Sequence, residues 1–326
     1  MPSLTVQAET WPLARTFTIS RGSRTEAKVV VVELAEDGIR GRGEGVPVPR
    51  YGLDADAVIT QIESQRSALE AGLTREELQE RLAPGPARCA LDCAFWDLEA
   101  KLSARPAWDL AGLDAPLPVV TALTVSLDTP ERMGEAAAEA ADYPILKIKL
   151  DGEAVLERVT AVREAAPEAR LVVDANEAWP PESLPEVLPR LAELGVEMVE
   201  QPLSADADRD LARLQRSVPV CADESCPDSA TVEGLEERYD MVNIKLDKTG
   251  GLTEALKLKA AAEARGLGIM VGCMIGTSLS MAPAMLVAQG AAVVDLDGPL
   301  WLKEDRGEGL VIENGLVHPP SAALWG

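Results

Sequence analysis

The chain has 326 residues with 31 basic and 54 acidic side chains, so its formal net charge is −23. This length exceeds one average domain and suits a barrel of the (β/α)8 type with an additional small domain. The negative charge opposes binding to phosphate backbones and to anionic membrane surfaces, so we expect neither nucleic acid nor a membrane as a partner. The N-terminal residues lack the basic start and apolar core of a secretory signal, which predicts a cytoplasmic protein.

Residues 1–115 have the pattern of a mixed α+β domain. Asp37-Gly38 predicts a tight hairpin turn, and Thr74 with Glu77 three residues later predicts a capping box at the start of a helix. The expected strands cover residues 3–9, 16–20 and 27–35, and a further helix covers residues 87–103.

Short runs rich in β-branched residues alternate with helical stretches in residues 116–298. Successive runs lie about 25 residues apart, which is too long for hairpins and suits one strand and one crossover helix per repeat. The pattern predicts a parallel barrel with a helix between each pair of strands, followed by a C-terminal tail at 299–326. The eight runs are residues 119–127, 145–151, 170–176, 197–203, 219–225, 241–247, 268–274 and 291–297.

Histidine and cysteine usage narrows the possible chemistry. His318 is the single histidine and lies near the C-terminus, so mechanisms that need a histidine base are not expected. The five cysteines include no CxxC pair, which favours neither a disulfide framework nor a zinc site. A metal would therefore use oxygen ligands, as Mg2+ and Mn2+ do, and catalysis would depend on carboxylates and lysines.

Polar residues lie at or near the C-terminal end of almost every run. A buried charge at the end of a parallel strand is costly unless it binds something, and active sites of parallel barrels are built at this rim. We therefore predict one active site from these side chains. They are Thr124, Lys147, Lys149, Asp174, Glu200, Asp223, Lys245, Asp295 and Asp297.

Two of these residues share one face of the run ILKIKLD. Strand alternation places Ile145, Lys147 and Lys149 together. In an isolated strand such a face would be solvated, but helices cover the outside of a parallel barrel. The lysines are therefore expected to point inward.

Three acidic residues follow consecutive runs. A single such residue is usually a helix N-cap or part of a surface ion pair. Asp174, Glu200 and Asp223 lie 26 and 23 residues apart, however, so a barrel places them on adjacent strands within reach of one cation. The spacing predicts a Mg2+ site of three carboxylates. Lys149 lies one strand before these residues and Lys245 one strand after, and two bases on opposite faces suit racemisation or epimerisation.

The runs contain the motifs KIK at 147–149, DAN at 174–176, EQP at 200–202, ADES at 222–225 and the lysine of NIKLDKTGG at 243–251. Together these motifs resemble the enolase superfamily, and specifically its muconate-lactonizing-enzyme subgroup. The resemblance covers the whole chain. It implies a modified TIM barrel, (β/α)7β, covered by an α+β capping domain to which the C-terminal tail returns.

Asp295-Leu296-Asp297 at the eighth run resembles the Asp-x-Asp of the dipeptide epimerases in that subgroup. RGSR at 21–24 and PRYG at 49–52 are similar to the two capping-domain loops of L-Ala-D/L-Glu epimerases. The resemblance implies that Arg24 meets the glutamate side chain of a dipeptide and that the two aspartates meet its ammonium group. From the residues alone, Arg24 is more typical of a mobile surface residue in a charged hairpin, and Asp295 is equally compatible with a structural carboxylate.

The activity implied by the resemblance is a Mg2+-dependent inversion of the α-carbon of the C-terminal residue, from L-Ala-L-Glu to L-Ala-D-Glu, in murein peptide metabolism. Lys149 would accept a proton on one face and Lys245 would donate one on the other. Lys147 and the cation would lower the pKa of Lys149, and Lys147 would also contact the substrate carboxylate. Thr124 is expected among the substrate-binding residues.

Other functions are also compatible with the sequence. The same scaffold could perform N-acylamino acid racemisation, muconate cycloisomerisation or o-succinylbenzoate synthesis, although substrates of those reactions lack an ammonium group for an Asp-x-Asp pair. A Schiff-base lysine aldolase would need no metal, and a non-catalytic barrel would bind without reacting. A homo-oligomer, dimer or octamer, is compatible with the sequence.

Overall fold

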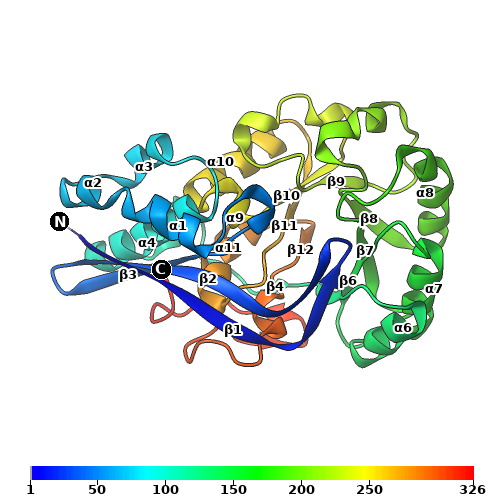
Figure 1. Ribbon diagram of the computed structural model, residues 1–326, viewed down its shortest axis with the longest axis horizontal. Coiled ribbons are helices and arrows are strands. Elements are labelled where there is room, and N and C mark those ends of the chain that lie inside the picture. Colours follow the sequence, from blue (N-terminus) through cyan, green and yellow to red (C-terminus); the bar gives the residue numbers. More distant parts are fainter. Residues whose placement is uncertain (1) are drawn as a thin grey trace.

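A computed structural model describes residues 2–326 of the chain. It contains a three-stranded antiparallel sheet, an eight-stranded parallel sheet and a small third sheet of three strands. Figure 1 shows the antiparallel sheet and its helices beside the curled parallel sheet. The predicted fold class, a barrel-type α/β structure with a separate α+β part, is confirmed.

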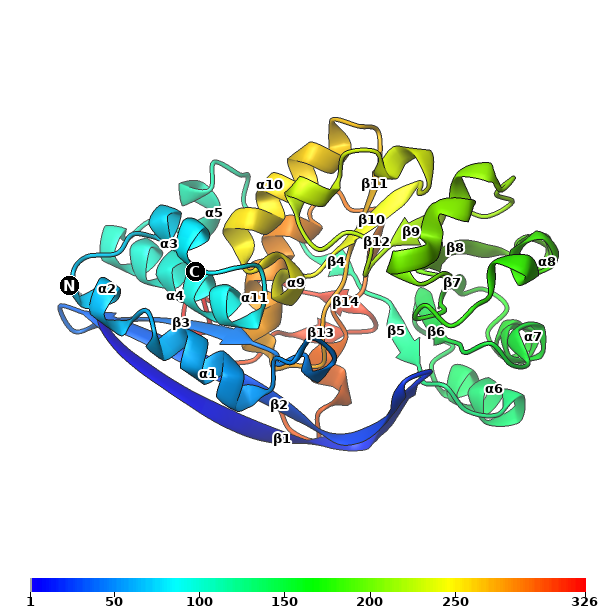
Figure 2. The same cartoon turned by 45° about the horizontal axis from the view of Figure 1, so that its top comes forward.

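The antiparallel sheet consists of β1 (Ser3–Ile19), β2 (Gly22–Glu36) and β3 (Ile39–Gly45) in chain order. The prediction of two separate strands within β1 was wrong. Pairing with β2 resumes after a register shift between Pro12 and Phe17, so one long strand bridges the interval. The resulting β1–β2 ribbon reaches from the helical side of the molecule to the edge of the parallel sheet near β5 and β6 (Figure 2).

The turn and helix signals in this part of the chain are confirmed. Asp37 and Gly38 both have positive φ, 52° and 80°, as a type I′ hairpin turn requires. Thr74 and Glu77 form the predicted capping box at the start of α3. The helices are η1 (Pro49–Tyr51), α1 (Ala55–Glu63), α2 (Arg66–Glu70), α3 (Arg75–Arg81), α4 (Pro86–Ser103) and α5 (Ala107–Leu110).

Three glycines on β3 let α4 pack directly on the antiparallel sheet. Gly41, Gly43 and Gly45 alternate along the strand and therefore share one face. A methyl group added at any of them would lie less than 2.5 Å from a backbone carbonyl oxygen of α4. The close packing of α4 on β3 thus requires glycine at these alternating positions, between which Arg42 and Glu44 lie.

The parallel sheet runs in strand order β12-β11-β10-β9-β8-β7-β6-β5. The amide of Ala122, just before β5, donates to the carbonyl of Val294 in β12 at 2.7 Å, so the two ends of the sheet meet. The strands are β5 (Leu123–Val125), β6 (Ile145–Lys149), β7 (Arg170–Asp174), β8 (Val196–Glu200), β9 (Val220–Ala222), β10 (Met241–Ile244), β11 (Gly268–Val271) and β12 (Val293–Val294).

The first predicted run, 119–127, splits into two strands. Its second half is β5, whereas β4 (Val119–Val120) leaves the barrel and pairs with β14 (Leu316–Val317), which in turn pairs with β13 (Ile312–Glu313). The split follows from the hydrogen bonds that close the barrel at Ala122. Residues before that point lie beyond the barrel and pair with the C-terminal hairpin instead.

The expectation of a helix between every pair of strands was wrong at two places. The connections around β9 contain only the 3-10 helices η3 (Ala205–Arg213), η4 (Ser229–Thr231) and η5 (Leu235–Glu237). The other connections carry η2 (Pro181–Ser183), α6 (Pro130–Glu139), α7 (Val155–Ala165), α8 (Leu184–Glu193), α9 (Leu246–Thr249), α10 (Leu252–Glu263) and α11 (Ser278–Ala288), and η6 (Gly298–Trp301) follows β12.

The inside of the barrel is layered. One buried cluster takes a single inward-pointing side chain from each strand region: Ala122, Ile145, Val172, Met198, Cys221, Met241, Met270 and Val293. Because side chains alternate with a period of two, the residue two positions further along each strand also points inward, one layer closer to the C-terminal rim. That second layer contains Thr124, Lys147, Asp174, Glu200, Asp223 and Asp295. An apolar layer therefore supports a polar layer.

The C-terminal segment runs back to the antiparallel sheet and its helices. The indole Nε1 of Trp325 donates to the carbonyl of Cys93 at 2.9 Å, and the amide of Gly326 donates to Oδ1 of Asp97 at 2.7 Å. Both acceptors belong to α4. The tail follows the barrel in the chain, so these two hydrogen bonds link the barrel to α4.

Among the described residues no helix is long and apolar enough to span a bilayer.

Candidate active site

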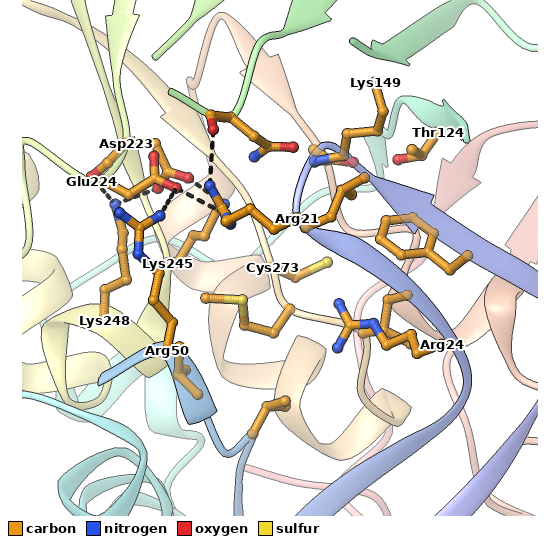
Figure 3. Close-up of a pocket in the computed structure, with 18 of the residues that line it drawn as sticks. Arg21, Arg24, Arg50, Thr124, Lys149, Asp223, Glu224, Lys245, Lys248 and Cys273 are labelled. Carbon is orange, nitrogen blue, oxygen red and sulfur yellow. Dashed lines mark hydrogen bonds and ion pairs between the residues drawn. The ribbon is translucent and has the colours of Figure 1, made fainter. Parts of the chain in front are cut away.

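A pocket opens at the C-terminal rim of the barrel, beneath the β1–β2 ribbon and the loop that contains η1. Barrel residues line one part of it and residues of the antiparallel sheet region line the other. Figure 3 shows Lys149 and Thr124 on one side of this pocket and Lys245 and Asp223 on another. The rim residues predicted from the sequence therefore reach one cavity or the buried layer directly below it.

Both lysines of β6 point into the barrel, because their strand has no solvated face. Lys147 is 1% exposed, and its Nζ lies 2.6 Å from Glu200, 2.8 Å from Asp295 and 3.3 Å from Asp174. Lys149 lies two residues further along β6, nearer the rim, and its Nζ contacts Asp174 at 2.6 Å. Lys147 thus lies inside the carboxylate cluster, whereas Lys149 lies at its edge and lines the pocket.

Lys245 approaches the cluster from the other side. It directly follows β10, and its Nζ lies 2.7 Å from Asp223 and 3.6 Å from Glu200. Among the described residues, Lys149 forms an ion pair only with Asp174, whereas Lys245 forms ion pairs with Asp223 and Glu200. The two ammonium groups are therefore separated by the carboxylates.

The three predicted metal ligands come together, but lysines lie among them. Asp174 pairs with Glu200 in the parallel register, and Asp223 follows the next strand, β9. Within residues 2–326 no group of three or more His, Cys, Asp or Glu side chains stands in a geometry that could hold a metal ion directly. Ammonium groups lie beside oxygens of two of these residues, because Lys147 Nζ is 2.6 Å from Glu200 Oε2 and Lys245 Nζ is 2.7 Å from Asp223 Oδ2.

The donor set nevertheless suits a hard cation. All three side chains offer only oxygen, and all are buried. Glu200 Oε2 and Asp223 Oδ1 are inaccessible to solvent and accept no hydrogen bond of good geometry, although lysine nitrogens lie near both. Buried carboxylate oxygens without hydrogen bonds are costly, and coordination of a divalent cation by oxygen ligands would satisfy them.

Lysine–carboxylate pairing controls the protonation of this cluster. Burial alone would lower the pKa of Lys245, but Asp223 and Glu200 outweigh burial and raise that pKa. The pKa of Lys147 is raised in the same way by Asp295 and Glu200. A lysine that serves as a base must lose this stabilisation of its charged form, and a cation on the same carboxylate oxygens would remove it.

The eighth-strand aspartates differ in their partners. Asp297 Oδ2 accepts hydrogen bonds from the amide of Thr124 at 2.7 Å and from Nε1 of Trp301 at 3.1 Å. Burial and the neighbouring Asp295 raise the pKa of Asp297 to about 6. Asp295 pairs with Lys147 through Oδ2, and its buried Oδ1 accepts no hydrogen bond. Both aspartates line the pocket, so a cationic ligand group could satisfy Asp295.

Arg24 lines the pocket from β2, opposite the lysines. Its guanidinium lies 5.3 Å from the ring centre of Phe17. In the described part of the chain Arg24 forms no ion pair with a carboxylate. A cation over an aromatic ring and without a carboxylate partner is suited to bind an anionic ligand group.

Several residues that fix the predicted ligands were not singled out from the sequence. Asn243 donates to Glu200 Oε1 at 2.7 Å. Gln201, with a positive φ of 36°, accepts the amide of Asp223 at 2.8 Å. Lys248 lies 2.6 Å from Asp223 Oδ1 and donates to the carbonyl of Asn243. Their only sequence signal is membership of the EQP and NIKLDKTGG motifs.

Comparison with known families matches both parts of the chain. Residues 131–323 match the family described as enolase C-terminal domain-like. Residues 1–112 match the N-terminal domain of the mandelate racemase / muconate lactonizing enzyme family. The chain belongs to the enolase superfamily.

Two curated relatives and one solved structure relate this enolase-superfamily member to epimerases and racemases. It is 48% identical to the L-Ala-D/L-Glu epimerase of Escherichia coli, over 98% of this chain and 100% of that protein. It is 42% identical to an N-acetyl-D-glutamate racemase of a Pseudoalteromonas species, over 91% and 95%. An Agrobacterium tumefaciens enolase family member with homology to dipeptide epimerases, solved with sodium and L-Ala-L-Glu, shares 51% identity and a TM-score of 0.98 over all of both chains.

These relatives place the superfamily member among the isomerases that act on amino acid derivatives. The predicted recognition and the predicted enzyme class are thereby confirmed.

Proposed function

We propose that this chain is a Mg2+-dependent dipeptide epimerase that interconverts L-Ala-L-Glu and L-Ala-D-Glu at the α-carbon of the C-terminal residue. The observation that carries the proposal is the arrangement of two lysines, Lys149 and Lys245, on separate sides of one buried carboxylate cluster at the pocket. Inversion of a carbon centre needs a proton acceptor on one face and a proton donor on the other.

The metal ligands in this proposal are Asp174, Glu200 and Asp223. Their oxygens form a hard donor set, and two of them lack hydrogen bonds of good geometry. When bound, a divalent cation supplies positive charge that stabilises the negative charge arising on the substrate carboxylate as the α-proton leaves. Mn2+ would suit the same donors.

The lysines perform the proton transfers. Lys149, as the free amine, removes the α-proton from one face of the substrate, and Lys245, as the ammonium, returns a proton from the other face. In the reverse direction the two exchange roles. Lys147 stays protonated inside the cluster, where Asp295 and Glu200 hold it, and contributes positive charge toward the substrate carboxylate.

The two ends of the dipeptide would contact opposite walls of the pocket. The buried Oδ1 of Asp295 has no hydrogen bond and would accept one from the substrate ammonium, with Asp297 beside it. Arg24 would pair with the side-chain carboxylate of glutamate. Thr124, which also lines the pocket, would contact the peptide. Murein peptides contain such dipeptide units, so the proposed role is murein peptide salvage in the cytoplasm.

A second candidate function is racemisation of an N-acylated amino acid, favoured by the 42% identity to an N-acetyl-D-glutamate racemase. An acyl group would remove the ammonium charge and leave Asp295 Oδ1 buried without a partner. Leaving a buried acceptor unsatisfied costs about 1–3 kcal/mol, and more when it is charged. The geometry of Asp295 therefore favours the free dipeptide.

The function is tested by incubating the protein in D2O with Mg2+ and either L-Ala-L-Glu or N-acetyl-L-glutamate. We expect deuterium at the glutamate α-carbon and formation of the D-isomer with the dipeptide, detected by mass spectrometry and chiral chromatography. EDTA should abolish the exchange and added Mg2+ should restore it. Faster exchange with N-acetyl-L-glutamate would support the second candidate. Activity that persists in EDTA and is trapped by borohydride would support a Schiff-base lysine.

Replacement of Arg24 by methionine tests the recognition of an acidic side chain. Because a charge-assisted pair in a partly buried pocket contributes about 1.5–3 kcal/mol, kcat/KM for L-Ala-L-Glu should fall about 10–100-fold. The value for a neutral dipeptide such as L-Ala-L-Met should change little. Arg132→Met, at an exposed arginine on α6, is the control and should leave both substrates unaffected. Equal losses for both dipeptides would show that Arg24 does not read the side chain.

A further inference from the structure

Arg21, at the tip of the β1–β2 ribbon, is tied to the barrel rim. Its Nη1 donates to the carbonyl of Asn176 at 2.9 Å, and its Nη2 lies 3.1 Å from Oε1 of Glu224. Nη1 also lies 3.5 Å from Oε2 of Glu177. Figure 3 shows Arg21 directed toward Glu224, with its interactions drawn as dashed lines.

Arg50, from η1 in the second loop over the pocket, contacts the same two carboxylates. It forms an ion pair with Glu177, and its Nη1 lies 3.8 Å from Oε1 of Glu224. The glutamate side chains are 7% and 6% exposed, whereas those of Arg21 and Arg50 are 36% and 40% exposed. The carboxylates are therefore buried in the barrel loops, and the two loops over the pocket bring the arginines to them.

Both glutamates lie in barrel loops, shortly after proposed metal ligands in the chain. Glu177 lies three residues after Asp174, and its Oε1 accepts the amide of Ala205 at 3.0 Å. Glu224 directly follows Asp223. The barrel loops next to the proposed metal ligands thus also present a pair of buried carboxylates to the β1–β2 ribbon and the η1 loop.

The three arginines that line the pocket have different surroundings. Arg21 and Arg50 are balanced by Glu177 and Glu224, while in the described residues Arg24 has no carboxylate partner. Arg24 lies three residues after Arg21, just beyond the tip of the same ribbon, where Gly22 has a φ of 135°. Because only two residues separate Arg21 from Arg24, the contacts of Arg21 restrict the position of Arg24.

We infer that Glu177 and Glu224 are positioning residues, which anchor Arg21 and Arg50, hold the two loops over the pocket and set Arg24 at the distance needed to read an acidic substrate side chain. The part that concerns Arg24 rests on the proposed function. Arg21 and Arg50 are consumed by this anchor, so they do not recognise the substrate. The ribbon has a second attachment near its tip, because the amide of Thr18, which pairs with Ser23, donates to Ser126 Oγ at 2.7 Å. The glutamates act on the turn beyond this attachment.

Glu177→Gln is the decisive variant, because it removes the charge and keeps the oxygen that accepts the amide of Ala205. Glu224 is left unchanged in the test, since it adjoins Asp223. Glu182→Gln, at an exposed residue in η2, is the matched control. Glu177→Asp retains the charge and should recover part of the wild-type behaviour.

Two readouts report on the anchor. The first is limited trypsin digestion without substrate, followed by mass spectrometry, because cleavage after Arg24 requires the ribbon tip to open. Residues in contact typically have coupling energies large enough to change an opening equilibrium about tenfold. We therefore expect Glu177→Gln to be cleaved about tenfold faster than wild type and Glu182→Gln. The second is steady-state kinetics, in which KM for L-Ala-L-Glu should rise about tenfold while kcat stays within about twofold, because the proton-transfer groups are untouched.

Non-additivity provides the final test. As a single variant, Arg50→Met should raise KM. In the double variant with Glu177→Gln it should raise KM little further, because both changes break the same interaction. Unchanged cleavage and KM in Glu177→Gln would overturn the inference, as would a loss confined to kcat. The proteolysis experiment needs no substrate. If wild-type protein fails to exchange the dipeptide but Glu177→Gln is still cleaved faster, the proposed function fails while the anchor stands.

Discussion

Replacing either Lys149 or Lys245 by alanine is expected to abolish epimerisation, with kcat/KM for L-Ala-L-Glu lowered by about 10²–10⁴-fold. Each lysine is buried beside a different carboxylate, Asp174 or Asp223, on separate sides of the cluster. The other amines near these carboxylates are engaged elsewhere, because Lys147 lies inside the carboxylate cluster and Lys248 donates to three backbone carbonyls. Loss of one lysine therefore removes the proton acceptor for one diastereomer and the proton donor for the other.

The two variants should fail in complementary ways. In D2O each should still exchange the α-proton of the one diastereomer that faces its remaining lysine, without forming the other diastereomer. NMR of L-Ala-L-Glu and L-Ala-D-Glu in separate reactions distinguishes the two half-reactions. Lys257→Ala, at an exposed lysine on α10, is the control and should behave as wild type. If either active-site variant still epimerises at the wild-type rate, the two-base assignment is wrong.

Gly43→Ala is expected to destabilise the fold by about 3 kcal/mol or more, at the upper end of the cost of overpacking. A methyl group at this position would lie 2.1 Å from the carbonyl oxygen of Ala90 and 2.6 Å from the amide of Ala94. Both atoms are α4 backbone, which cannot rotate away as a side chain could. Relief requires separation of α4 from the antiparallel sheet, which exposes part of a buried apolar cluster.

Urea denaturation followed by circular dichroism measures this change as a shift in the free energy of unfolding. Gly307→Ala is the matched control, since a methyl group there meets nothing within 4 Å, and it should alter stability by less than about 0.5 kcal/mol. Similar unfolding midpoints for the two variants would contradict the close packing of α4 on β3. A large loss confined to Gly43→Ala would support it.

Strand-level features could be predicted from the sequence because they depend on local alternation. A period of two fixed the inward direction of Lys147 and Lys149 once helices were assumed outside the barrel. The regular spacing of Asp174, Glu200 and Asp223 put the carboxylates on neighbouring strands, and their parallel pairing brings them together. The turn at Asp37-Gly38 and the capping box at Thr74 are equally local, so both were predicted correctly.

The pairing within the pocket could not be predicted, because it joins residues far apart in the chain. Arg21 contacts Glu224 across 203 residues, and Lys147 contacts Asp295 across 148. Local sequence gives no reason to distinguish Arg21 and Arg50, which pair with carboxylates, from Arg24, which pairs with none among the described residues. The same applies to β4, whose residues suit a barrel strand but pair with the C-terminal hairpin.

The sequence by itself determined the order of strands, the inward faces and the chemical types at the rim, since these follow from periodicity and residue identity. Only the tertiary structure decided which charges neutralise each other. Ion pairing depends on separations of a few ångströms, and those are set by how the β1–β2 ribbon and the η1 loop lie over the barrel. That placement results from packing of the whole chain, including glycines that admit α4 and a tail that returns to it.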